Sequence, residues 1–229
     1  MGVIPLTDAS RRPTRMPVVT ASIIAANAFV FILELLGGDA FVTKWSLAPA
    51  NIVAGKDWIT ILTSMFMHGG WFHLLGNMWF LWVFGNNIED SMGHTRFVVF
   101  YLLSGVAAAA TQVLVSPHSV VPMVGASGAI SGVMGAYILL YPRVRVHTLV
   151  TLGFFVTTVA LPAYVMLGYW FVLQLLMGAV GSVSRVEGGV AVWAHVGGFV
   201  AGMALIKLFA NRDYLERRRG GVVILPRDA

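Results

Sequence analysis

The chain has 229 residues, of which 58% are hydrophobic and only 11% are charged, and it contains no cysteine. This composition excludes an ordinary soluble domain, in which about a quarter of the residues are charged, and the missing cysteines exclude disulfides and thiolate metal sites. The formal net charge of +5 does not indicate a nucleic-acid partner, because the cations flank apolar stretches of helix length, a pattern that predicts an all-α polytopic membrane protein.

The first predicted elements are a basic arm and a membrane-spanning helix. Residues 1–16 carry three arginines and are interrupted by prolines, so they do not form a secretory signal. The apolar run 17–37 is long enough to span the membrane and is expected to enter it from the cytosol. Glu34, near its far end, is predicted to lie at the membrane interface. Residues 38–72 mix large apolar and polar side chains, which predicts a folded interfacial loop.

Three further helices are expected in the middle of the chain, over about 73–85, 97–115 and 127–142. The third of these stops at a proline that is followed by two arginines. Between the first two, Glu89 and Arg96 are predicted to form a structural ion pair at the cytosolic end.

The mostly apolar block 146–180 is too long for one helix and short for two. Ser127 and His195 both lie near the N-terminal ends of their helices, so they share a membrane level only if an odd number of spans separates them. We therefore expect a short membrane-hugging segment over about 146–159 and one span over about 161–180.

A last helix over about 192–209 and a basic cytosolic tail, 211–229, complete the prediction. The membrane domain covers residues 17–210 and forms a bundle of six transmembrane helices with both termini in the cytosol. This arrangement leaves only three of the fifteen Lys and Arg residues on the other side, as the positive-inside rule requires.

Three polar residues reach a similar depth in these helices. Ser127 lies sixteen residues before Arg143, or about 24 Å at the helical rise of about 1.5 Å per residue. His195 and Asn77 each lie twelve residues before a cytosolic charge, or about 18 Å. The loop 116–126 must then descend into the membrane, which is tolerated only inside protein or around a water-filled cavity.

Serine and histidine are the minimum for nucleophilic acyl chemistry, because imidazole takes the hydroxyl proton as the oxygen attacks. Glycines at 128, 132, 198 and 202 would let the helices that carry Ser127 and His195 approach closely. The soluble-hydrolase G-x-S-x-G elbow is absent, since Ala129 replaces its last glycine. With no carboxylate at the depth of His195, the prediction is a Ser–His dyad rather than a triad.

His73 and Asn77 are four residues apart and share a helix face. Both could donate hydrogen bonds to an oxyanion together with the Ser127 backbone N–H, or they could form a polar clamp between helices. His68 precedes His73 by five residues and no H-E-x-x-H motif occurs, so neither a metal nor another cofactor is predicted.

Five segments in this order and spacing resemble motifs of the rhomboid family of intramembrane serine proteases: residues 63–68, 73–78, 85–97, 125–128 and 194–199. The resemblance implies Ser127 as nucleophile, His195 as base, and His73 and Asn77 with the Ser127 amide as oxyanion site. It also implies single-span membrane proteins as substrates. Two positions depart from the family pattern: Ser131 replaces an aromatic residue that stacks on the imidazole, and Ile59 follows Trp58 where the family has arginine.

Two other functions are weighed against a protease. A non-catalytic rhomboid-like protein could bind membrane helices for quality control, although such relatives usually lose the serine or the histidine, and both are present. A transporter would show an inverted repeat or paired intramembrane carboxylates, and neither is found in the sequence. The expected location is a bacterial cytoplasmic membrane.

Overall fold

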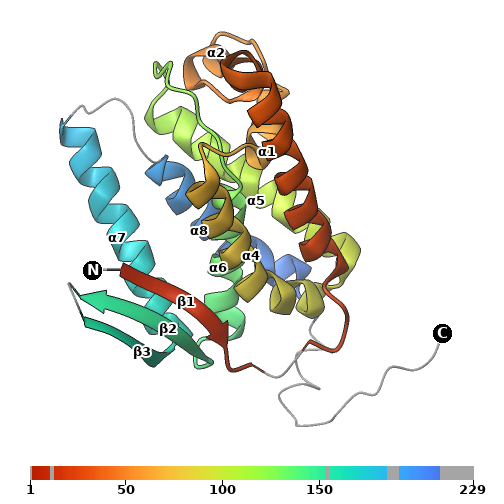
Figure 1. The fold of residues 1–229 in the computed structure, drawn as a ribbon, viewed down its shortest axis with the longest axis vertical. Coiled ribbons are helices and arrows are strands. Elements are labelled where there is room, and N and C mark those ends of the chain that lie inside the picture. Colours follow the sequence, from red (N-terminus) through yellow and green to blue (C-terminus); the bar gives the residue numbers. More distant parts are fainter. Residues whose placement is uncertain (1, 11–12, 153–154, 185–190, 212–229) are drawn as a thin grey trace.

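The computed structural model describes residues 2–10, 13–152, 155–184 and 191–211, and it is mostly helical (Figure 1). The helices are α1 (Val18–Trp45), α2 (Pro49–Val53), α3 (Thr60–Thr63), a short 3-10 turn η1 (Ser64–Phe66), α4 (Trp71–Met92), α5 (His94–Val115), α6 (Ser127–Leu140), α7 (Ala163–Ser184) and α8 (Val192–Phe209). The strands are β1 (Gly2–Asp8), β2 (Arg145–Leu152) and β3 (Phe155–Pro162).

Four helices in the described part of the chain are long and apolar enough to cross a membrane: α1, α5, α7 over Ala163–Gly181, and α8. These helices confirm the apolar spans predicted over 17–37, 97–115, 161–180 and 192–209. Helix α6 is also apolar but has only 14 residues. The first helix runs past its predicted end at Gly37, with a break at Gly38, where a φ of 59° favours glycine.

The prediction of helices alone is wrong for two stretches, because β1, β2 and β3 form an antiparallel sheet in that order. Strand β1 lies in the arm 1–16 and pairs with β2 from Gly2 opposite Thr151 to Asp8 opposite Val146. The described parts of the stretch 146–159, which was expected to hug the membrane, lie in the paired strands β2 and β3. Both hairpin strands are rich in valine and threonine, whose branched side chains favour strands over helices.

The sheet is fixed to the helices and carries the start of α7. The Asp8 carboxylate accepts hydrogen bonds from the Asn87 amide, at 2.8 Å, and from the Tyr137 hydroxyl. Strand β3 runs directly into α7, and the Ala163 N–H donates to the Val144 carbonyl at 2.8 Å. Helix α7 therefore rises from the sheet at the edge of the bundle (Figure 1).

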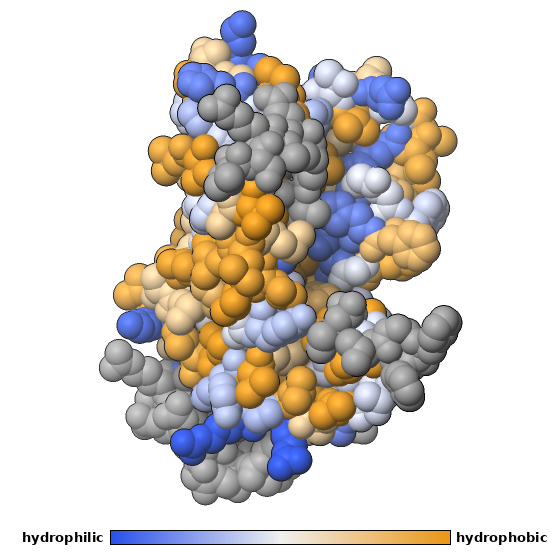
Figure 2. All heavy atoms as spheres, turned by 90° about the vertical axis from the view of Figure 1, so that its left-hand side faces the viewer, coloured by the Kyte–Doolittle hydropathy of each residue, from blue (hydrophilic) through white to orange (hydrophobic). Residues whose placement is uncertain are grey.

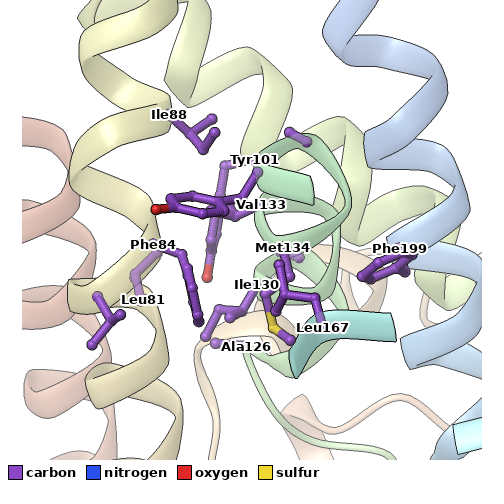
Figure 3. Close-up of a cluster of buried hydrophobic side chains, with 14 of the residues drawn as sticks. Leu81, Phe84, Ile88, Tyr101, Ala126, Ile130, Val133, Met134, Leu167 and Phe199 are labelled. Atoms are coloured by element: carbon purple, nitrogen blue, oxygen red, sulfur yellow. The ribbon is translucent and has the colours of Figure 1, made fainter. Parts of the chain in front are cut away.

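Helix α6 lies inside the bundle, where every residue from Gly128 to Tyr137 is buried. Figure 3 shows its side chains, among them Ile130 and Val133, in one core cluster with Phe84 of α4 and Tyr101 of α5. By contrast, the outward face of α7 exposes Val172, Leu176 and other apolar side chains. Figure 2 shows hydrophobic residues gathered across the middle of that side of the molecule, as expected where a protein meets lipid.

The predicted close approach of the Ser127 and His195 helices is confirmed. A Cβ atom placed on Gly198 would lie 2.0 Å from the Gly128 carbonyl oxygen, and one on Gly202 would lie 1.9 Å from the Gly132 carbonyl oxygen. Any side chain at these positions of α8 would collide with the backbone of α6. The glycines thus set the distance between the two helices.

The predicted ion pair between Glu89 and Arg96 is wrong. The buried Glu89 carboxylate instead accepts hydrogen bonds from the N–H groups of Val19 and Thr20, at 2.9 and 2.8 Å, and contacts the His94 ring at 2.6 Å. The first N–H groups of a helix have no partner within it and attract negative charge, so Glu89 caps α1, while the Arg96 side chain is exposed.

Candidate functional site

The structure brings Ser127 and His195 together. Ser127 is the first residue of α6, His195 lies in the first turn of α8, and His195 Nε2 is 2.7 Å from Ser127 Oγ. The His195 side chain is buried, at 7% exposure. A hydroxyl and an imidazole on neighbouring helices therefore form the hydrogen bond that a nucleophile–base pair requires.

The loop that precedes Ser127 is irregular but well bonded. Gly125 has a φ of 133°, which favours glycine, and its N–H donates to the Ser64 carbonyl at 2.9 Å. Further along the loop, Met123 and Leu47 exchange backbone hydrogen bonds of 2.7 and 3.1 Å. The folded segment before α4 therefore supplies hydrogen-bond partners to the backbone of this loop at Met123 and Gly125.

His73 and Asn77 lie on the same side of α4, beside Ser127. The Gly69 N–H donates to His73 Nδ1 at 3.2 Å, so in the neutral ring the hydrogen is on Nε2. A Cβ atom on Gly125 would lie 3.0 Å from this Nε2, which places the ring against the turn before Ser127. The amide nitrogen Nδ2 of Asn77 is buried and lacks a hydrogen-bond partner among the described residues. The site thus holds two N–H donors next to the serine.

These residues line a cavity of about 1360 Å³, which is larger than the roughly 300–1,000 Å³ of small-molecule pockets. Its wall is formed by α4 to α8 and the loop before α6, and it includes Ser127, His195, His73, Asn77, Gln112 and Gln174. The cavity therefore has room for a chain segment as well as water.

A residue that the sequence analysis missed contacts His195 from the other side. Gln174 Oε1 on α7 is 2.9 Å from His195 Nδ1, and the Trp170 ring, one turn earlier, lies 5.9 Å from the imidazole at an angle of 40°. The Ser131 hydroxyl instead donates to the Ser127 carbonyl of its own helix, at 2.6 Å. The signal for Gln174 was present in the sequence, because a polar amide in an apolar span is a candidate for function.

Two further polar groups organise the loop before α4. Glu34, for which an interfacial position stays a prediction, is buried within the protein and accepts hydrogen bonds of 3.0 and 3.2 Å from the His68 N–H. The His68 ring is also buried, and its nitrogens have no hydrogen-bond partner in the described part of the chain. Burial, together with the nearby His73 ring, lowers the pKa of the His68 imidazole to about 4.

Trp58 and Ile59, where the sequence has isoleucine in place of the arginine of the family pattern, lie in an exposed turn. Both side chains are exposed, and the segment is held nearby by the Thr63 hydroxyl, which donates to the Trp45 carbonyl at 2.8 Å.

Within the residues that the structure describes, no three His, Asp or Glu side chains are grouped so that they could hold a metal ion.

Comparison with known proteins identifies the family. A family profile described as "Rhomboid domain" matches residues 55–212, which is more than half of the chain. The chain belongs to the rhomboid family. This assignment confirms the family that the five motifs resemble. Together with the apolar helices, it identifies the rhomboid as a multi-pass integral membrane protein.

Several named rhomboid proteins are similar to this chain. Rhomboid protease GluP of Bacillus subtilis is 29% identical over 87% of the chain and 37% of its own length. Rhomboid-like protein 11, chloroplastic, of Arabidopsis thaliana is 28% identical over 67% of the chain and 53% of its own length. Rhomboid protein 1, mitochondrial, of Saccharomyces cerevisiae is 32% identical over 55% of the chain and 37% of its own length. The chain therefore spans only about a third to a half of the length of these relatives.

Proposed function

We propose that this rhomboid is an intramembrane serine endopeptidase that hydrolyses a peptide bond in or next to the transmembrane segment of single-span membrane proteins. The observation that carries the proposal is the 2.7 Å contact between Ser127 Oγ and His195 Nε2 at the wall of a large cavity. The name of GluP as a rhomboid protease supports it.

In this proposal Ser127 is the nucleophile and His195 is the general base. His195 Nε2 takes the hydroxyl proton as Ser127 Oγ attacks the scissile carbonyl, and then gives that proton to the leaving amine. Water in the cavity, activated by the same nitrogen, hydrolyses the acyl-enzyme and restores Ser127. The two side chains act as a pair without a carboxylate.

The oxyanion that forms on attack is stabilised by N–H groups already in place. Nε2 of His73 lies beside Gly125, and Nδ2 of Asn77 is buried without a partner in the described chain, so each has a free donor for the developing charge. The Ser127 backbone N–H, at the N-terminus of α6, supplies a third.

We further propose six spans with both termini in the cytosol. Helix α6 has 14 residues, or about 21 Å, against about 30 Å of hydrocarbon. If its C-terminal end, near Arg143, lies at the cytosolic face, Ser127 lies below the opposite surface. A substrate helix must then unwind locally to present an extended peptide bond to it.

The proposed location is a bacterial cytoplasmic membrane. The GluP relative comes from a bacterium, whereas other relatives are named chloroplastic or mitochondrial. Expression in the source cell followed by membrane fractionation tests this location, and enrichment in an organelle fraction would contradict it.

The catalytic pair is tested with Ser127→Ala and His195→Ala in liposomes that contain a reporter single-span substrate. Both variants should lose cleavage, because each lacks one half of the proton-transfer pair, while Ser104→Ala and His147→Ala should cleave normally. A serine-directed fluorophosphonate should label the wild type and not Ser127→Ala. Equal labelling of the two proteins, or unchanged cleavage by either pair variant, would exclude the protease and favour a non-catalytic helix-binding role.

A further inference from the structure

The His195 ring has a second hydrogen-bond partner on a different helix from Ser127. Nε2 is 2.7 Å from Ser127 Oγ, and Nδ1, on the other edge of the ring, is 2.9 Å from Gln174 Oε1. To accept the serine proton, Nε2 must carry no hydrogen, so the hydrogen of the neutral ring is on Nδ1. An amide oxygen only accepts hydrogen bonds, so the contact with Gln174 requires the same tautomer as the contact with Ser127.

We propose that Gln174 is a positioning residue, which holds the His195 ring in its Nδ1–H tautomer with Nε2 turned toward Ser127. This inference rests on the proposed protease function and extends it, since Gln174 takes the place that a carboxylate has in a serine-protease triad. An amide fixes the orientation of the ring without adding a second buried charge beside it.

The packing of α7 on α8 holds the Gln174 side chain within hydrogen-bond distance of His195. One turn before it, the Trp170 ring lies 5.9 Å from the His195 ring and 6.1 Å from the Phe199 ring. One turn after it, a Cβ atom on Gly178 would lie 3.1 Å from the Trp193 ring. The glutamine is thus held between two close contacts of α7 with α8, and its amide can reach Nδ1 without a change in helix position.

A structural explanation must be separated from the positioning role. The same hydrogen bond joins α7 to α8, so its loss could lower stability without affecting catalysis. The two explanations differ in what they predict for the tautomer of His195 and for the chemical step. A merely structural contact predicts neither a change of tautomer nor a slower reaction of Ser127 in protein that remains folded.

The kinetic test compares Gln174→Met with Leu175→Met, which places the same side chain on an adjacent exposed position of α7. In Gln174→Met, the rate of fluorophosphonate labelling of Ser127 and the kcat for the reporter substrate should both fall about 10–100-fold. The KM for the substrate should stay within about twofold of the wild-type value. Leu175→Met should behave as wild type. Gln174→Glu should restore most of the rate, because a carboxylate oxygen accepts the same hydrogen bond.

Gln174→Asn provides a second variant if the methionine impairs folding, since it keeps the amide but shortens its reach, and it should show the same loss. Labelling of Gln174→Met as fast as that of Leu175→Met would overturn the inference. A rise in KM with kcat unchanged would also overturn it, because Gln174 would then bind substrate.

A second measurement does not depend on protease activity. In protein labelled with ¹⁵N-histidine, the His195 signals, assigned by their loss in His195→Gln, should report the Nδ1–H tautomer in the wild type and a mixture of tautomers in Gln174→Met. An unchanged tautomer in the variant would overturn the positioning role. If the wild type cleaves no reporter but the tautomer changes, the positioning role stands and the proposed function fails.

Discussion

Asn77 illustrates at the scale of a single residue how an unpaired group can point to function. Its amide nitrogen is buried and has no hydrogen-bond partner in the described chain, a condition that costs about 1–3 kcal/mol. Next to it, His73 is fixed as an Nε2–H donor by the Gly69 N–H. Both groups line the cavity that contains Ser127, so an oxyanion would supply the acceptor that these donors lack.

The prediction for this pair is a loss of rate without a loss of fold. His73→Ala and Asn77→Ala should each reduce kcat about 10²–10³-fold, as removal of an oxyanion donor does. Cleavage of the reporter substrate in liposomes measures the effect, and Asn86→Ala, on the same helix but outside the cavity, is the control. Full activity in both variants would mean that the two groups only pack between helices.

A second prediction for a single residue concerns His68, whose burial should make the stability of the protein depend on pH. With a pKa near 4, the buried ring stays neutral in the folded protein, whereas in the unfolded chain it takes up a proton near its ordinary pKa of 6.5. Its contribution to stability is therefore complete above pH 6.5 and is lost as the pH falls toward 4.

The measurement is thermal unfolding in detergent across this pH range. Between pH 6.5 and pH 4 the free energy of unfolding should fall less in His68→Asn than in the wild type, by up to about 3 kcal/mol. The exposed His118 provides the control, and His118→Asn should follow the wild type. Parallel curves for His68→Asn and wild type would show that other groups, such as Glu34, govern the acid sensitivity.

At the scale of elements, the contact between α6 and α8 decides whether Ser127 and His195 can meet. The Cβ atom of Gly202→Val would lie 1.9 Å from the Gly132 carbonyl oxygen, so the helices must separate. This variant should lose about 3 kcal/mol or more of stability together with fluorophosphonate labelling of Ser127. Gly181→Val, where a Cβ meets nothing within 4 Å, should change neither property, and an active Gly202→Val would contradict this account of the packing.

The elements also show how far the sequence could be interpreted. The last helix was predicted over 192–209 and is observed at the same bounds. A long apolar run that ends in a basic residue can be recognised as a helix from the sequence alone. The β2–β3 hairpin was missed, because its length and apolar character resemble a membrane segment. Its strand identity depends on pairing with β1, which lies far away in the sequence.

At the scale of the whole molecule, the topology can be tested by labelling, since the chain has no cysteine of its own. Three exposed positions are suitable: Ala9, Lys56 and Arg143. With both termini in the cytosol, a membrane-impermeant maleimide should label Lys56→Cys in intact cells and should label Ala9→Cys and Arg143→Cys only after permeabilisation. Labelling of Ala9→Cys in intact cells would overturn the six-span proposal.

The sequence by itself determined the class of the protein, its family, most of its apolar helices and the pairing of Ser127 with His195. Composition, span length and short motifs are local properties, so they can be recognised without knowing the neighbours of each residue. Only the tertiary structure decided that β2 and β3 form a sheet with β1, that Glu89 caps α1 rather than pairing with Arg96, and that Gln174 contacts His195. Each of these depends on which distant partner offers the better hydrogen bond, and that choice is made only when the helices pack.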